Sequence, residues 1–346
     1  MSTVAERADL VERLGVGGPV AWRLVEDFLG GDPGSRTRSL HALKPPRVYR
    51  WEFAPGSPWG SLVLKRLEPV VAQRVRLVAE RWLPDLGLAD HCPRLLGIAA
   101  EQAGESVWLA YEDLGDVTLA ERAGPEELAA VVELVAELHV RAARHRLLPD
   151  ARRYCTARGM EYFTTNVGDA VSALEALTAA GIEAPEPHEG IVGRLRERLR
   201  ALMAEGRERA AVFARARGPD TLLHGDLWPI NVFVSGGRVR LVDWDFTGVG
   251  PASYDLSTLV MRYPRAQRPA IVDRYQAAVA RAGWRTPAAS ELEVLLDTAE
   301  RARYANRVIW PALALLRERA DWGFPELAEV ERWIEALDAS APIVPT

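Results

Sequence analysis

The residues best suited to chemistry lie in one short segment, Leu222–Asp245, which reads LLHGDLWPINVFVSGGRVRLVDWD. It contains Asp226, then Asn231 five residues later, then Asp243 at the end of an apolar run. A loop amide and a carboxylate on a returning hairpin can together hold Mg²⁺, which prefers oxygen ligands and shares them with phosphates. Asp226 is then free to accept a proton from an attacking hydroxyl. The segment therefore predicts phosphoryl-transfer chemistry, which needs little beyond metal, positioning and a base.

Two alternatives stay open within this segment. The pattern also fits an ordinary polar turn closed by an asparagine cap. Asp245 is a second acid close to Asp243 and could exchange roles with it.

The elements that must position these residues follow from the local pattern. Two short apolar runs, Val232–Val234 and Val239–Val242, are joined by Ser-Gly-Gly-Arg, which predicts a tight β-hairpin. Upstream, runs rich in β-formers predict three further strands, over Arg47–Phe53, Ser61–Leu67 and Val107–Tyr111. Helical spacing predicts a helix over Val70–Leu83 and another that opens at Pro19 and stops at Gly30.

The second part of the chain reads as mainly helical. A helix begins at Pro125, Ile191–Ala216 has the pattern of one long helix, and the remainder reads as helices broken by Pro264, Pro287, Pro311 and Pro325. We therefore expect an α+β fold with a small N-terminal unit (1–110), a hinge (111–116) and a larger, mainly helical unit (117–346).

The catalytic segment resembles a known family. HGDLWPIN followed by RLVDWDFTGVGPASYDL is similar to the aminoglycoside phosphotransferase and choline kinase group, distant relatives of protein kinases. HGDLW also resembles the fructosamine kinase branch, whereas the VDWD ending is closer to the aminoglycoside phosphotransferase branch. The resemblance implies a protein-kinase-like fold and transfer of a phosphoryl group from ATP or GTP, with Mg²⁺, to a hydroxyl of a small molecule.

The resemblance also implies residue roles. Asp226 is expected to be the catalytic base, and Asn231 and Asp243 the Mg²⁺ ligands. His224 is expected to anchor the loop. Asp255 resembles the family's buried aspartate that steadies this loop, although an acid at a helix N-terminus is an equal alternative.

In the N-terminal unit, Lys65 lies on a predicted strand where kinase-like folds place a lysine for the nucleotide phosphates. Glu80, fifteen residues on, is expected to orient Lys65 by a charge-assisted hydrogen bond. The alternatives are a surface lysine and a solvated helix face.

The hinge residues Glu112, Asp113 and Leu114 resemble the linker whose backbone holds the adenine edge. The turn that should cover the phosphates falls near Leu43–Arg47 and has no glycine. Either Gly31–Ser35 forms that loop, or Lys44 and Arg47 contact phosphate.

The acceptor site of the family lies in the C-terminal helices, where residues 291–346 hold eleven acids and six arginines. Such a surface would suit a cationic acceptor, such as an aminoglycoside or amino sugar. The alternative is a solvated helix surface. Trp228, Tyr254, Trp310 and Trp322 could supply aromatic surfaces near that site. For Trp310 and Trp322, which lie at helical spacing, the alternative is core or inter-unit packing.

Composition and net charge also limit the partners and the location that we expect for this protein. A net charge of −5 argues against nucleic acid as a partner, and no apolar run approaches the length of a membrane span. Cys92 and Cys155 lie far apart without a metal-binding pattern, which favours buried thiols and a cytoplasmic location. The rival hypotheses are a catalytically silent kinase fold that binds a nucleotide or a partner, and a kinase acting on protein.

Overall fold

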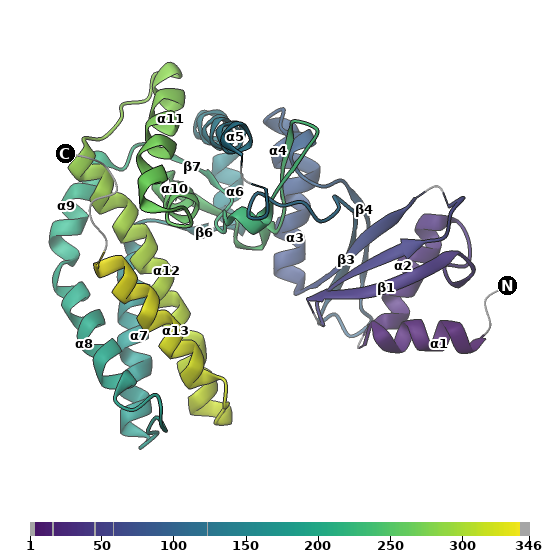
Figure 1. Ribbon diagram of the computed structural model, residues 1–346, viewed down its shortest axis with the longest axis horizontal. Helices are drawn as coiled ribbons and strands as arrows, with labels where there is room; N and C mark the ends of the chain where they lie inside the picture. Colours follow the sequence, from purple (N-terminus) through teal and green to yellow (C-terminus); the bar gives the residue numbers. More distant parts are fainter. Residues whose placement is uncertain (1–3, 16, 45, 58, 123, 340–346) are drawn as a thin grey trace. The chain divides into compact units, whose positions relative to one another are not determined.

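The computed structural model describes residues 4–15, 17–44, 46–57, 59–122 and 124–339. The chain forms two compact units (Figure 1). One comprises Met1–Val131 with Pro229–Thr247, and the other comprises Val132–Trp228 with Gly248–Thr346. None of the described helices is long and apolar enough to cross a membrane.

The first unit is built on an antiparallel five-stranded sheet with the strand order β1-β2-β3-β5-β4. Its strands are β1 (Thr37–Lys44), β2 (Val48–Phe53), β3 (Ser61–Leu67), β4 (Leu95–Ala100) and β5 (Val107–Glu112). The strands predicted over Arg47–Phe53 and Ser61–Leu67 are present as β2 and β3, and their side chains alternate in burial, with Trp51, Leu62 and Leu64 fully buried. The edge strands β1 and β4 carry few buried side chains, and neither is predicted by the sequence pattern.

Two N-terminal helices, α1 (Val4–Arg13) and α2 (Gly18–Leu29), cover one side of this sheet (Figure 1). Helix α2 has Pro19 in its first turn and ends at Gly30, whose positive φ of 62° reverses the chain. Its buried Trp22 packs in one core with Trp51 and Trp108.

The predicted helix over 70–83 is present in three pieces. Helix α3 (Pro69–Leu77) leads into a π-helical turn, Val78–Trp82, and then into the short α4 (Leu83–Asp85). A π-helical turn rotates later side chains relative to the α-helical register.

The predicted hairpin is β8 (Val232–Ser235) paired with β9 (Arg238–Leu241). Gly236 and Gly237 both have positive φ, of 57° and 76°, as a two-residue hairpin turn requires. The hairpin packs within the first unit, where the His91 ring hydrogen-bonds the Val239 carbonyl.

Helix α5 (Pro125–Ala143) begins in the first unit and continues into the second. The second unit is otherwise mainly helical and includes a three-stranded sheet, β6 (Thr156–Ala157), β10 (Gly248–Pro251) and β7 (Asp220–Leu223). Its other helices are α6 (Leu148–Tyr154), α7 (Met160–Ala179), α8 (Ile191–Ala204), α9 (Gly206–Ala216), α10 (Ser253–Val260), α11 (Arg268–Arg281), α12 (Ala289–Glu318) and α13 (Gly323–Asp338). Helix α12 packs against α7, α9, α10 and α13, so it forms the centre of the helical core (Figure 1).

Two helix predictions in this unit are wrong. The expected single helix over 191–216 is two helices, because the chain turns at Glu205 and Gly206, and glycine is a poor helix former. Pro311 does not break α12, which continues to Glu318. The missing N–H of Pro311 is offset by burial of Val308, Ala312 and Leu315 along the same helix.

The predicted hinge (111–116) begins with the last two residues of β5 and lies within the first unit. The hairpin flanked by Asn231 and Asp243 belongs to that unit as well. The division of the chain at residues 110 and 117 stays a prediction.

Candidate active site

Lys65 lies on β3, opposite Val48 of β2 and Leu109 of β5. Its ammonium group donates to the carboxylate of Asp243 and, at 2.6 Å, to Oδ1 of Asp245. All three residues belong to the first unit. The structure therefore places a cation between two carboxylates at the end of the hairpin.

Asp243 follows β9 in a left-handed conformation, with φ of 65°. Aspartate tolerates this region better than most residues because its short polar side chain can bond locally. Its side chain remains about one-third exposed, so it is accessible to a ligand.

Asn231 comes directly before β8, at the same open end of the hairpin as Asp243; it lies on the short 3₁₀ turn Pro229–Asn231 and is 7% exposed. Its carbonyl accepts a hydrogen bond of 2.9 Å from the N–H of Val242, which precedes Asp243. The hairpin thus returns the chain beside Asn231, as the sequence spacing predicts.

The oxygen donors at this end of the hairpin suit Mg²⁺, and Lys65 shows that positive charge is stabilised between Asp243 and Asp245. No group of three or more His, Cys, Asp or Glu side chains among the described residues could hold a metal ion alone. Mg²⁺ takes few protein ligands and completes its shell with water and phosphate oxygens.

Asp245 is nine-tenths buried, and burial raises the pKa of its carboxyl group. The charge of Lys65 opposes that rise in pKa, whereas the neighbouring Asp243 adds to it. The Arg47 guanidinium lies 3.4 Å from the other oxygen of Asp245. Asp245 therefore contacts two cations.

The predicted pairing of Glu80 with Lys65 is not formed. Glu80 lies on the π-helical turn, half exposed, and accepts a hydrogen bond of 2.6 Å from Arg76. The i,i+4 spacing on the helix makes Arg76 the nearer partner, while Lys65 is already bound by Asp243 and Asp245. A role for Glu80 in nucleotide binding stays a prediction.

The side chains of Glu112, the last residue of β5, and of Asp113 after it are bound within the first unit. Glu112 accepts from Arg240 at 2.7 Å and from the N–H of Arg94 at 2.8 Å. Asp113 accepts from Ser61 at 2.7 Å and pairs with Arg50 at 2.8 Å. Nucleotide binding by Glu112, Asp113 and Leu114 stays a prediction, and with both carboxylates engaged it would fall to the backbone.

The loop His224–Gly225–Asp226 follows β7 in the second unit. His224 is fully buried, and its Nδ1 accepts a hydrogen bond of 3.3 Å from the N–H of Asp226. The Asp226 carbonyl accepts from the N–H of Trp228 at 2.8 Å. The histidine is an anchor beneath the loop, and the Asp226 side chain is partly exposed.

Asp255, at the start of α10, holds this loop from below. Its fully buried carboxylate accepts from the N–H groups of His224 and Gly225, at 2.7 and 2.8 Å. Burial by itself would raise the pKa of Asp255, but hydrogen bonds from His139 and Gly225 outweigh it and lower that pKa. Asp255 is therefore an acid in the first turn of a helix, and it also holds the loop that contains Asp226.

His139 is a site residue that sequence reasoning missed. It lies on α5, fully buried, with Nε2 3.2 Å from Asp255 and Nδ1 2.7 Å from the hydroxyl of Tyr275. An ionised carboxylate only accepts, so Nε2–H donates to Asp255 and Nδ1 accepts from Tyr275. The available signal was a histidine on the apolar face of a predicted helix.

The aromatic residues proposed for the acceptor differ in exposure. Tyr254 is buried, while Trp310 and Trp322 are 65% and 51% exposed, so neither tryptophan belongs to the core. The Trp228 ring lies 3.8 Å below the guanidinium of Arg262, a cation–π contact just after the Asp226 loop.

The acidic surface expected over residues 291–346 is largely neutralised. Arginines from outside residues 291–346 pair with its acids, and these pairs are Arg215–Glu291, Arg209–Asp297, Arg262–Glu300, Arg194–Glu331 and Arg198–Glu335. The surface therefore offers a cationic acceptor far less attraction than the count of acids suggests.

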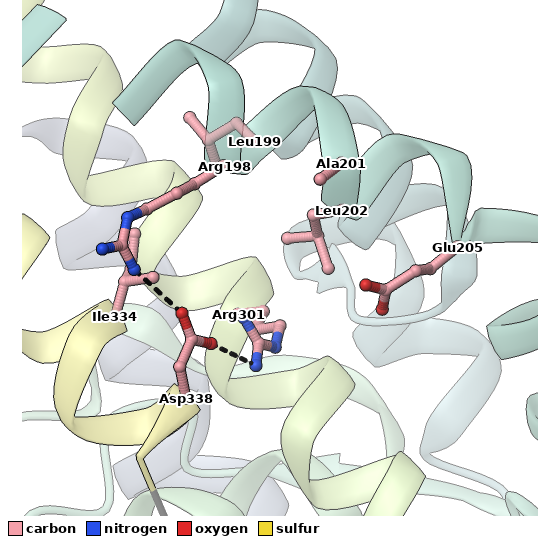
Figure 2. Close-up of a pocket in the computed structure, with 8 residues that line it drawn as sticks. All are labelled: Arg198, Leu199, Ala201, Leu202, Glu205, Arg301, Ile334 and Asp338. Atoms are coloured by element: carbon pink, nitrogen blue, oxygen red, sulfur yellow. Dashed lines mark hydrogen bonds and ion pairs between the residues drawn. The ribbon is translucent and has the colours of Figure 1, made fainter. Parts of the chain in front are cut away.

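A cavity of about 170 Å³ lies in the second unit among α8, α12 and α13 (Figure 2). Its charged groups are already paired, with Asp338 accepting from both Arg198 and Arg301 (Figure 2). It contains none of the predicted site residues, and we assign no function to it.

The cysteines carry no chemistry of this site. Cys92 is buried, and burial raises the pKa of its thiol to about 12. Cys155 is half-buried, and the two are not joined by a disulfide.

Comparison with known proteins assigns the fold. The chain aligns with the GDP complex of aminoglycoside 2'-phosphotransferase-IIIa at 14% identity and a TM-score of 0.59, covering 87% of this chain and 94% of that one. For choline kinase from Cryptosporidium parvum the identity is 10% and the TM-score 0.56, covering 88% and 90%. For AMP-bound spectinomycin phosphotransferase the values are 12% and 0.58, covering 92% and 98%. The fold is therefore the α+β kinase-like fold.

The family model of the phosphotransferase enzyme family matches residues 41–290. That range includes Lys65, the hairpin and the Asp226 loop, and it covers most of the chain. No curated protein matches the sequence. The chain belongs to the phosphotransferase enzyme family, and it is a kinase of small molecules.

Proposed function

We propose that this enzyme transfers the γ-phosphoryl group of ATP or GTP to a hydroxyl group of a small molecule. The observation that carries the proposal is the convergence of Lys65, Asp243 and Asp245 near the hairpin that begins after Asn231, within the residues that the family model matches. Nucleotide complexes of structurally similar phosphotransferases, with GDP and with AMP, support the choice of a nucleotide donor.

Each residue then has a role that follows from its chemistry. Lys65 binds the α- and β-phosphates, and the backbone near Leu114 binds the base. Asn231 and Asp243 would hold Mg²⁺, which when bound neutralises the charge on the phosphates.

On the acceptor side, the carboxylate of Asp226 takes the proton of the attacking hydroxyl as the oxygen–phosphorus bond forms and the nucleoside diphosphate leaves. His224 and Asp255 keep the Asp226 backbone in place. An aminoglycoside or amino sugar remains the proposed acceptor class, on the strength of the sequence resemblance.

A catalytically silent fold that binds nucleotide or a partner is the rival function. Lys65, Asn231, Asp226 and Asp243 are all intact, and a scaffold has no need of a catalytic base together with metal ligands.

The test is a coupled nucleotide-turnover assay with Mg·ATP and Mg·GTP against a panel of aminoglycosides, other antibiotics, amino sugars, choline and methylthioribose. We expect acceptor-dependent turnover that falls by at least about 10²- to 10⁴-fold in Asp226→Asn, with nucleotide affinity nearly unchanged. Asp169→Asn, which removes an exposed carboxylate on α7, should keep full activity. Substantial turnover in Asp226→Asn would show that another group is the base.

A further inference from the structure

The turn between β1 and β2 has the wrong composition for a backbone phosphate cradle. Such cradles present free N–H groups, usually from glycine. In the sequence, the three residues between Lys44 and Val48 are Pro-Pro-Arg, and proline has no N–H. The N–H of Arg47 is already donated to the Lys44 carbonyl, at 2.8 Å. A phosphate at this turn would have to be bound by a side chain.

Register places Arg47 beside Lys65. Val48 pairs with Lys65, and the Arg47 carbonyl accepts a hydrogen bond of 2.8 Å from the N–H of Arg66. Backbone hydrogen bonds therefore place Arg47 next to Lys65, at the strand position where kinase-like folds have a phosphate-binding lysine.

The two side chains also converge. The Lys65 ammonium lies 2.6 Å from Oδ1 of Asp245, and the Arg47 guanidinium lies 3.4 Å from Oδ2 of the same carboxylate. The Arg47 side chain is half exposed, and a guanidinium has five N–H donors, so most of them remain available to a ligand. Planar donors of this kind bind phosphate oxygens in pairs.

The alternative loop lies at the wrong end of the strands. Gly31–Ser35 precedes β1, and Thr37, which follows it, pairs with Phe53 at the far end of β2 from Val48. β2 is six residues long, which separates the two ends by about 17 Å. Lys44 is exposed at the near end, but it forms no ion pair with any described residue.

We propose that Arg47 binds the β- and γ-phosphates of the nucleoside triphosphate, in place of the backbone N–H groups of a glycine-rich loop. Asp245 holds the guanidinium near Lys65 until the phosphates replace it as partner. The inference rests on the proposed function, because it takes the hairpin and Lys65 to be the site of the phosphate donor.

The test measures dissociation constants of AMP, ADP and ATP (and of the guanosine series) with Mg²⁺, by calorimetry on the full chain. Arg47→Ala should weaken triphosphate binding by about 10- to 100-fold and leave AMP within about twofold. Arg47→Lys keeps the charge but loses the paired donors, so its affinity for the triphosphate should lie between those of the wild type and Arg47→Ala. Arg38→Ala, which removes an exposed arginine of β1, should bind all three nucleotides like the wild type.

Equal losses for AMP and the triphosphate in Arg47→Ala, or no loss, would overturn the inference and leave the proposed function standing. So would a loss seen in Lys44→Ala instead. If the wild-type chain binds none of these nucleotides, the proposed function and the inference both fall. Thermal melting of each variant verifies that it is folded.

Discussion

At the scale of single residues, the buried carboxylate of Asp255 is the clearest structural determinant of the catalytic loop. It is fully buried, and its acceptor oxygens serve two backbone N–H groups and the ring of His139. A carboxylate replaced by an amide presents an NH₂ group to one of these donors. A buried donor left without a partner is costly.

We therefore expect Asp255→Asn to lower the free energy of unfolding by about 3 kcal/mol at pH 7, measured by urea denaturation. Asp273→Asn, at an exposed site on α11, should change it by less than about 0.5 kcal/mol. Because the folded-state pKa of Asp255 lies below its ordinary value of 3.8, its contribution is fully present above about pH 4. It is lost as the pH falls through the folded-state pKa, so the gap between wild type and Asp255→Asn should narrow there. Equal free energies of unfolding for the wild type and Asp255→Asn at pH 7 would contradict this role.

At the scale of elements, the β8–β9 hairpin decides where Asn231 and Asp243 lie. Its turn depends on Gly236 at φ 57° and Gly237 at φ 76°, where a side chain strains the backbone. A Cβ at Gly236 would meet no other atom within 4 Å, so the strain is purely conformational.

Gly236→Ala should therefore destabilise the chain by about 1 kcal/mol, and Gly236→Asn by less, because asparagine tolerates this conformation. Gly60→Ala is the matched control, since that glycine has open space and no positive φ; it should be neutral or slightly stabilising. Chemical denaturation of the three variants gives the comparison. A Gly236→Ala protein as stable as Gly60→Ala would show that the turn can change its geometry without cost.

At the scale of the whole molecule, a ligand that binds the folded chain raises its apparent stability by mass action, about 2.7 kcal/mol at one hundred times the dissociation constant. Thermal unfolding should therefore shift upward with Mg·ATP or Mg·GTP, and the shift should require Mg²⁺. Asp243→Asn should abolish the metal-dependent part of the shift, whereas Asp27→Asn, an exposed acid on α2, should retain it. A full metal-dependent shift in Asp243→Asn would assign the metal to Asp245.

The sequence alone determined the features that depend on neighbouring residues. The hairpin follows from its two glycines, and α2 from Pro19 and Gly30. The spacing of Asp226, Asn231 and Asp243 also indicates the candidate site, whose roles stay a prediction. Each of these is encoded within a few residues by backbone preference or by the chemistry of a short loop.

Only the tertiary structure decided the features that depend on distant partners. The edge strands β1 and β4 have little burial and hence no periodic signal, so pairing with β2 and β5 defines them. Lys65 binds Asp243 and Asp245, about 180 residues away, because the hairpin packs within the first unit. Glu80, in contrast, has Arg76 nearer on its own helix. Ion-pair and hydrogen-bond partners that lie far apart in the sequence are determined by tertiary packing, so the local sequence does not predict them.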